Sequence, residues 1–147
     1  MLQNQADVNV SETTDWTPLH IAALNGRVDV VKVLLQYQAN INASRNNGAT
    51  PLYIAAQNGH VDVVYVLLKN QANINTAKDN GTTPLFVAAQ NGHVGVVNIL
   101  LQYQADINAK QTSGATPLYI AAQNGHVDVV NVLLQHKADT EAKLKDG

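Results

Sequence analysis

The chain has 147 residues and a mass of 15.8 kDa, which suits one ordinary domain and is too short for two. Its formal charge of −2 argues against a nucleic-acid binder, which needs a basic surface. The absence of cysteine excludes a disulfide framework, a thiolate zinc site and a cysteine nucleophile. No signal peptide and no apolar run of roughly 18 residues occurs, so we expect a cytoplasmic protein without membrane insertion.

An internal repeat organises the sequence. The four prolines, Pro18, Pro51, Pro84 and Pro117, are each 33 residues apart. Around them stand TPLHIAALNGRVDVV, TPLYIAAQNGHVDVV, TPLFVAAQNGHVGVV and TPLYIAAQNGHVDVV. A period of about 20 to 50 residues is typical of a solenoid. We predict a single array over residues 1–147, with full repeats at about 11–43, 44–76, 77–109 and 110–142 and partial repeats at 1–10 and 143–147.

The sequence of each repeat predicts two short helices, and the first repeat is described here as the example. Thr17 before Pro18 is an N-cap followed by proline at the first helical position, and Asn25-Gly26 predicts the end of this helix. A second helix begins near Val28 and has apolar residues on more than one face. Asn47-Gly48 then predicts a tight turn in a connecting hairpin. Both helices are shorter than the ~12–15 residues of a marginally stable isolated helix, so stability must come from stacking.

With these motifs (TPLH or a variant, AAxxGH, VVxxLL and a QADIN-like tail) the chain resembles the ankyrin repeat family over essentially its whole length. The resemblance implies an all-α solenoid of helix-turn-helix units joined by β-hairpin loops. It also implies a non-enzymatic module that binds a protein partner. The partial repeats at both ends predict a segment of a longer array or a minimal one.

Two departures from the family pattern carry expectations. The family has glycine after the second helix, whereas this chain has Gln38, Gln71, Gln104 and Lys137. Because a non-glycine residue in the left-handed conformation is strained by roughly 1 kcal/mol, we expect these helices to end differently. The family histidine survives as His20 alone, and we expect its replacements to add aromatic surface; they are Tyr53, Phe86 and Tyr119.

No catalytic, cofactor or metal site is predicted. His60, His93 and His126 recur every 33 residues, and adjacent helices pack about 8–10 Å apart, too far to share one ion. We expect these histidines to bond the turn before the second helix. The serines have no suitably spaced histidine and aspartate, and no phosphate-binding glycine motif occurs.

The resemblance places the partner surface on the hairpins and on the concave ends of the first helices. The predicted binding residues are Glu12, Thr13, Trp16, Leu24, Tyr37, Arg45, Asn46, Tyr53, Gln57, Lys78, Asp79, Phe86, Gln90, Tyr103, Gln111, Thr112, Tyr119 and Gln123. Trp16 is either a binding hot spot or a cover for the first repeat. The recurring Gln-Asn pairs that begin at Gln57, Gln90 and Gln123 form either a hydrogen-bonding platform or a solvated face.

Three hypotheses follow for the whole chain. The first is a monomeric protein-binding module that presents a rigid concave surface. The second is a structural spacer within a longer array, favoured by the nearly uniform helix-end columns. The third is a designed or selected scaffold, suggested by the near-identity of the repeats.

Overall fold

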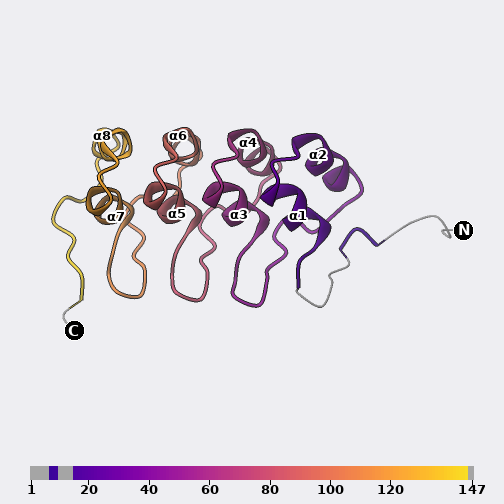
Figure 1. Ribbon diagram of the computed structural model, residues 1–147, viewed down its shortest axis with the longest axis horizontal. Helices are drawn as coiled ribbons and strands as arrows, with labels where there is room; N and C mark the ends of the chain where they lie inside the picture. The colour runs from indigo at the N-terminus through magenta and orange to yellow at the C-terminus, as the bar shows by residue number, and fades with distance from the viewer. Residues whose placement is uncertain (1–6, 10–14, 146–147) are drawn as a thin grey trace, which may run out of the picture.

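The computed structural model describes residues 7–9 and 15–145. Within these ranges lie eight α-helices, and no segment forms a strand. The inner helices are α1 (Pro18–Leu24), α3 (Pro51–Gln57), α5 (Pro84–Gln90) and α7 (Pro117–Gln123). The outer helices are α2 (Val28–Gln36), α4 (Val61–Lys69), α6 (Val94–Gln102) and α8 (Val127–Gln135). The predicted all-α solenoid is confirmed: Figure 1 shows two rows of helices, with the hairpin loops extending from the inner row.

The inner helices begin and end where the sequence predicts. In each repeat the threonine hydroxyl before the proline accepts a hydrogen bond from the backbone N–H three residues later, at 3.1 to 3.3 Å. Each inner helix ends before an Asn-Gly pair, whose glycine has a left-handed φ of +68° to +74°. Glycine adopts this conformation without a steric cost, so it ends the helix in a tight turn.

The prediction for the ends of the outer helices is wrong. Gln38, Gln71, Gln104 and Lys137 all adopt the left-handed conformation, with φ between 66° and 68°. The N–H of Gln38 donates to the Leu35 carbonyl and that of the buried Ala39 to the Leu34 carbonyl, each at 3.0 Å. These two hydrogen bonds and the burial of the alanine offset a strain of roughly 1 kcal/mol.

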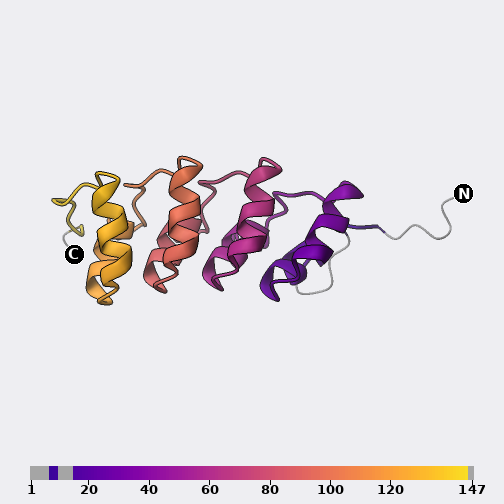
Figure 2. The same cartoon turned by 90° about the horizontal axis from the view of Figure 1, so that it is seen from above.

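The core forms where each helix packs against the equivalent helix of the next repeat. α1 packs on α3, α3 on α5 and α5 on α7, while the outer helices follow the same order. Figure 2, from above, shows the outer helices succeeding one another along the long axis of the molecule. The fully buried leucines come from both rows, for example Leu52 and Leu85 from inner helices and Leu67 and Leu100 from outer ones.

The recurring histidines join each repeat to the one before it. The Nε2 atom of His60 lies 2.9 Å from the carbonyl oxygen of Leu24, at the end of α1. His93 and His126 reach the carbonyls of Gln57 and Gln90 at 3.0 and 2.9 Å. The predicted structural role is confirmed, but the bonded turn belongs to the preceding repeat.

A ladder of asparagines makes a second set of links between repeats. The side-chain oxygens of Asn9, Asn42, Asn75 and Asn108 each accept from a backbone N–H in the next repeat, 31 residues later, at 2.7 to 2.9 Å. Sequence reasoning did not assign this column, although the same residue type recurs every 33 positions. These bonds hold the loops after the outer helices in register.

Candidate functional site

The hairpin loops form a continuous row linked by backbone hydrogen bonds. The N–H of Asp79 donates to the Asn47 carbonyl at 2.9 Å, and the N–H of Thr112 donates to the Asn80 carbonyl at 3.1 Å. Gly48 has a φ of +91°, and a Cβ there would lie 3.0 Å from the Cα of Lys78. The predicted tight turns are therefore confirmed, and the glycines also allow adjacent hairpins to approach closely.

The side chains at the hairpin tips differ between repeats and reach solvent. Asn46, Asp79 and Thr112 occupy the same position in three successive repeats, and all three are exposed. The preceding position holds the half-buried Arg45, Lys78 and Gln111. Two further predicted binding residues, Glu12 and Thr13, lie outside the described residues.

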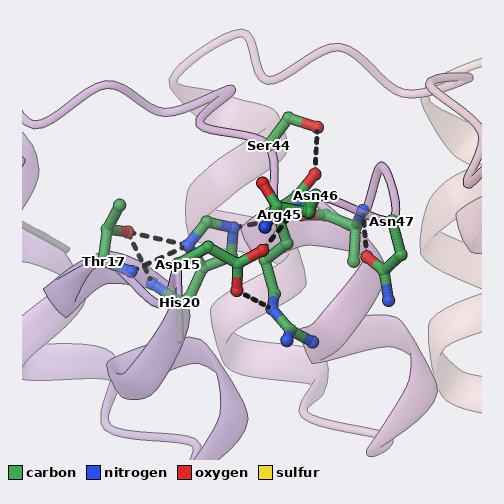
Figure 3. A network of polar contacts seen from close by, with 8 residues as sticks. Asp15, Thr17, His20, Ser44, Arg45, Asn46 and Asn47 are labelled. Carbon is green, nitrogen blue, oxygen red and sulfur yellow. Dashed lines mark hydrogen bonds and ion pairs between the residues drawn. The ribbon is translucent and has the colours of Figure 1, made fainter. Parts of the chain in front are cut away.

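A polar cluster joins the residues just before α1 to the second hairpin (Figure 3). Asp15, with a φ of 63°, stands where later repeats have glycine, and its carboxylate accepts from Arg45 Nε at 2.9 Å and from the Asn46 N–H. The Asn46 N–H, aided by the Arg45 guanidinium, holds the pKa of Asp15 below its usual value. The guanidinium also lies 4.1 Å from the centre of the Trp16 ring, which meets His20 edge-on. Arg45 and Trp16 thus contribute to the structure as well as to the surface.

The expectation of added aromatic surface is wrong for Tyr53 and Phe86. Only 4% of Tyr53 and 2% of Phe86 is exposed, because the next repeat covers them, and Tyr119 is half-buried. The hydroxyl of Tyr53 lies 3.1 Å from that of Thr82 in the following hairpin. Burial raises the pKa of Tyr53, and the bond to Thr82 partly opposes this shift.

His20 makes the corresponding contact in the first repeat. Its Nε2 lies 3.1 Å from the carbonyl oxygen of Ala49, and its Nδ1 lies 2.8 Å from the Thr17 hydroxyl. Burial lowers the pKa of His20, although the hydrogen bond to Ala49 opposes the effect. His20, Tyr53 and Phe86 therefore form a buried column that holds each repeat to the next. The contact is a histidine–carbonyl bond in the first repeat, a hydroxyl–hydroxyl bond in the second and apolar packing in the third.

The last residues of the inner helices are more exposed than Tyr53 and Phe86 in the first turns of these helices. These last residues are Leu24, Gln57, Gln90 and Gln123, here called the glutamine column. Gln57 and Gln123 are exposed, while Leu24 and Gln90 are half-buried. Within the described ranges, the side chains of these glutamines make no hydrogen bond. The neighbouring asparagines differ: Asn91 and Asn124, for example, donate to the carbonyls of the preceding repeat at 3.1 and 3.0 Å.

The remaining predicted residues lie at the ends of outer helices. Tyr37 follows α2 and is 65% exposed, and Tyr103 follows α6 and is 37% exposed. Sequence reasoning missed the exposed Tyr65, which lies in a groove of about 370 Å³ with Lys32 and Lys69. The signal was available, since this outer-helix column holds lysine, tyrosine and asparagine in successive repeats.

Neither a metal cluster nor a membrane span is present in the part of the chain that the structure describes. No group of three histidine, aspartate or glutamate side chains there could hold a metal ion. Each described helix is too short or too polar to cross a bilayer.

Comparison with protein families agrees with this geometry. A family model described as ankyrin repeats, in three copies, matches residues 1–78 and 71–144. The chain belongs to the ankyrin repeat family. Ankyrin repeats generally mediate protein–protein interaction. No curated protein matches this ankyrin array significantly.

Proposed function

We propose that this ankyrin array is a non-enzymatic, monomeric module that binds a protein partner in the cytoplasm. The partner contacts the hairpin tips and the inner helices, whose C-terminal ends carry Gln57, Gln90 and Gln123. One observation carries the proposal: the hairpin backbones are linked into a row, whereas the exposed tip side chains differ from repeat to repeat. A pre-ordered surface loses little conformational entropy on docking.

The exposure of each side chain determines which predicted residues belong to the proposed surface. Tyr53 and Phe86 are excluded from the proposed surface, because their buried side chains cannot contact a partner. The tips Asn46, Asp79 and Thr112 form its centre. Its edges are the remaining predicted residues within the described ranges, Trp16, Leu24, Tyr37, Arg45, Gln57, Lys78, Gln90, Tyr103, Gln111, Tyr119 and Gln123.

A matched pair of variants tests this surface. The tip variant carries Asn46→Lys, Asp79→Lys and Thr112→Lys, which leave the backbone bonds between hairpins intact. The control carries Asp62→Lys, Asn98→Lys and Asn131→Lys, exposed positions on outer helices with the same change in charge. Both are used with the unchanged chain as baits in lysate of the source cells, after circular dichroism shows equal helicity.

We expect one protein to be retained by the unchanged chain and by the control but lost from the tip variant. Equal retention by all three baits contradicts the assigned surface. If no bait retains a protein, the binding function itself is contradicted. The spacer hypothesis, which the uniform glutamine column supports, then becomes the better account.

A further inference from the structure

One groove on the outer face departs from the uniform pattern of the repeats. It lies between α2 and α4 and has a volume of about 370 Å³. Val28, Asp62 and Val66 line it, and the same residue types recur at these positions in other repeats. The remaining lining residues are of types found at these positions in no other repeat; they are Lys32, Tyr65, Lys69 and Asn70. In an array of near-identical repeats, these departures converge on one place.

The two lysines give this groove positive charge without a fixed partner. Lys32 comes from α2 and Lys69 is the last residue of α4, and both are exposed. In the described part of the chain the one ion pair joins Arg45 to Asp15, so neither lysine is paired with a carboxylate. Asp62 lies in the first turn of α4, where the helix dipole favours an acid. It is about 10 Å along the helix axis from Lys69, so the lysine end of the groove is positive.

An aromatic ring and two valines provide apolar surface beside the lysines. Tyr65 is 42% exposed, and the Lys69 ammonium lies 5.6 Å from the centre of its ring. Val28 is half-buried and Val66 is buried. Asn70 is smaller than the tyrosines that two other repeats have at this position, so it fills less of this end. The volume is near the lower limit of the roughly 300–1,000 Å³ of ligand sites, which suits one or two side chains of a partner.

We propose that the groove between α2 and α4 is a docking site for an acidic segment of a protein partner. Carboxylates of the segment pair with Lys32 and Lys69, and an apolar side chain between them packs on Tyr65 and Val66. Charge complementarity selects this occupant, because the two ammonium groups have no carboxylate of their own. The outer row lies on the side of the inner row away from the hairpins (Figure 1), so this segment does not compete for the hairpin tips.

Removal of the two lysines tests the site in solution. The probe is a short synthetic peptide in which glutamates flank one phenylalanine, added at millimolar concentration to the isotope-labelled full chain at low ionic strength. The groove variant, Lys32→Asn with Lys69→Gln, introduces residue types that other repeats have at these positions. The control, Lys110→Ala with Lys137→Gln, does the same at two exposed lysines elsewhere and removes the same charge. We expect NMR amide shifts at Tyr65 and Lys69, and a roughly fivefold loss of affinity in the groove variant alone.

Several results would overturn the proposal. Absence of shifts at Tyr65 and Lys69 contradicts it, and an equal loss of affinity in the control would indicate unspecific attraction to positive charge. Equal binding of a peptide with glutamines in place of the glutamates would show that charge is not recognised. Shifts of the groove residues on concentrating the chain alone would assign the groove to a second copy of the chain. A response to inorganic pyrophosphate but not to the peptide would assign it to a phosphate group.

Transfer of the groove to another pair of helices is an independent test. Between α6 and α8 the residues Val94, Asp128 and Val132 already occupy the positions of Val28, Asp62 and Val66. The set is completed by Asn98→Lys, Asn131→Tyr, Gln135→Lys and His136→Asn. We expect this variant to bind a second copy of the peptide, with new amide shifts in α6 and α8. Unchanged stoichiometry would show that these side chains do not form the site, which contradicts the proposal.

Discussion

Residues 48–64 and 114–130 have the same sequence and different environments. In the first segment Leu52 and Ala56 are fully buried and Tyr53 is nearly so. In the second the equivalent Leu118 and Tyr119 are half-buried and Ala122 is exposed. The first segment packs side by side with α5 and α6 of the next repeat, whereas α7 is covered on that side by no described helix.

The comparison shows that a residue in this solenoid is made part of the core by the neighbouring repeat. The local sequence determines the helix and its ends, and these are the same in both segments. Burial, and the energy that comes with it, depends on the next 33 residues. Pairs of identical substitutions in the two segments measure this difference directly.

The largest effect is expected for Leu52→Ala against Leu118→Ala. A leucine removed from a well-packed core costs roughly 2–5 kcal/mol of unfolding free energy, through lost transfer energy and the cavity left behind. Leu52 meets that description, and the half-buried Leu118 should cost less than half as much. Urea unfolding of both variants, followed by circular dichroism, measures the difference. Equal losses would mean that the neighbouring repeat contributes little.

Glycine substitutions separate backbone strain from contact between repeats. Gly59→Ala and Gly125→Ala both place a side chain at a φ of +74°, which costs roughly 1 kcal/mol. At Gly59 alone the new Cβ would lie 2.7 Å from the ring of His93, and overpacking adds about 1–3 kcal/mol. Thermal melts of the two variants should therefore differ. Equal melting temperatures would show that the histidine ring moves aside freely.

The hydroxyl of Tyr53 offers a smaller test. Tyr53→Phe leaves the buried Thr82 hydroxyl without this partner and should cost about 1 kcal/mol, whereas Tyr119→Phe should be nearly neutral. The Thr82 hydroxyl also donates to the Asn80 side-chain oxygen at 2.6 Å, so Thr82→Ala has a cost of its own. Adding Thr82→Ala to Tyr53→Phe recreates the buried pair found one repeat later, Phe86 and Ala115, and Thr82→Ala should cost less in that background than in the unchanged chain. A double-mutant cycle in urea measures this coupling, and additive losses would contradict it.

The smallest effect concerns pH. Burial lowers the pKa of His20, so the unfolded chain binds this proton more readily. The stability contribution is complete above the unfolded pKa of about 6.5 and is lost as the pH falls below it. Arg45 and Asp15 are the charged groups near this ring, and Asp15, whose pKa is held below its usual value by the Asn46 N–H, titrates in a separate, more acidic window.

His20→Phe, which places in the first repeat the residue type of Phe86, should reduce the loss of stability between about pH 7 and about pH 5. Urea midpoints of the variant and the unchanged chain, measured at both values, test this expectation. Parallel losses in the two proteins would assign the acid sensitivity to other groups.

Local sequence signals predicted the inner helices and their ends, but they did not predict the contacts that each helix makes with the neighbouring repeat. Thr-Pro and Asn-Gly pairs predict the inner helices because the cap, the proline and the left-handed glycine act within a few residues. The left-handed Gln38 was not predicted, because burial of the next alanine offsets a local strain. The burial of Tyr53 was also missed, since it depends on a hairpin 29 residues away.

The candidate binding surface was partly predictable for the same reason. Exposure at the hairpin tips follows from their polar, variable residues, and the structure agrees for Asn46, Asp79 and Thr112. Nothing in the sequence near Trp16 indicates that Arg45 lies on its ring, since the two are brought together by stacking.

The asparagine and histidine links also constrain how such a gene can change in length. The links from the ladder of Asn9, Asn42, Asn75 and Asn108 each span 31 residues, and those from His60, His93 and His126 each span 36. Recombination that removes or duplicates 33 residues reunites equivalent donors and acceptors, while an insertion of another size within a repeat displaces them. The buried column is less permissive, because each such event gives Tyr53 or Phe86 a new opposite residue. Inheritance of whole repeats is thus compatible with the fold, and compensating changes are expected at the junctions.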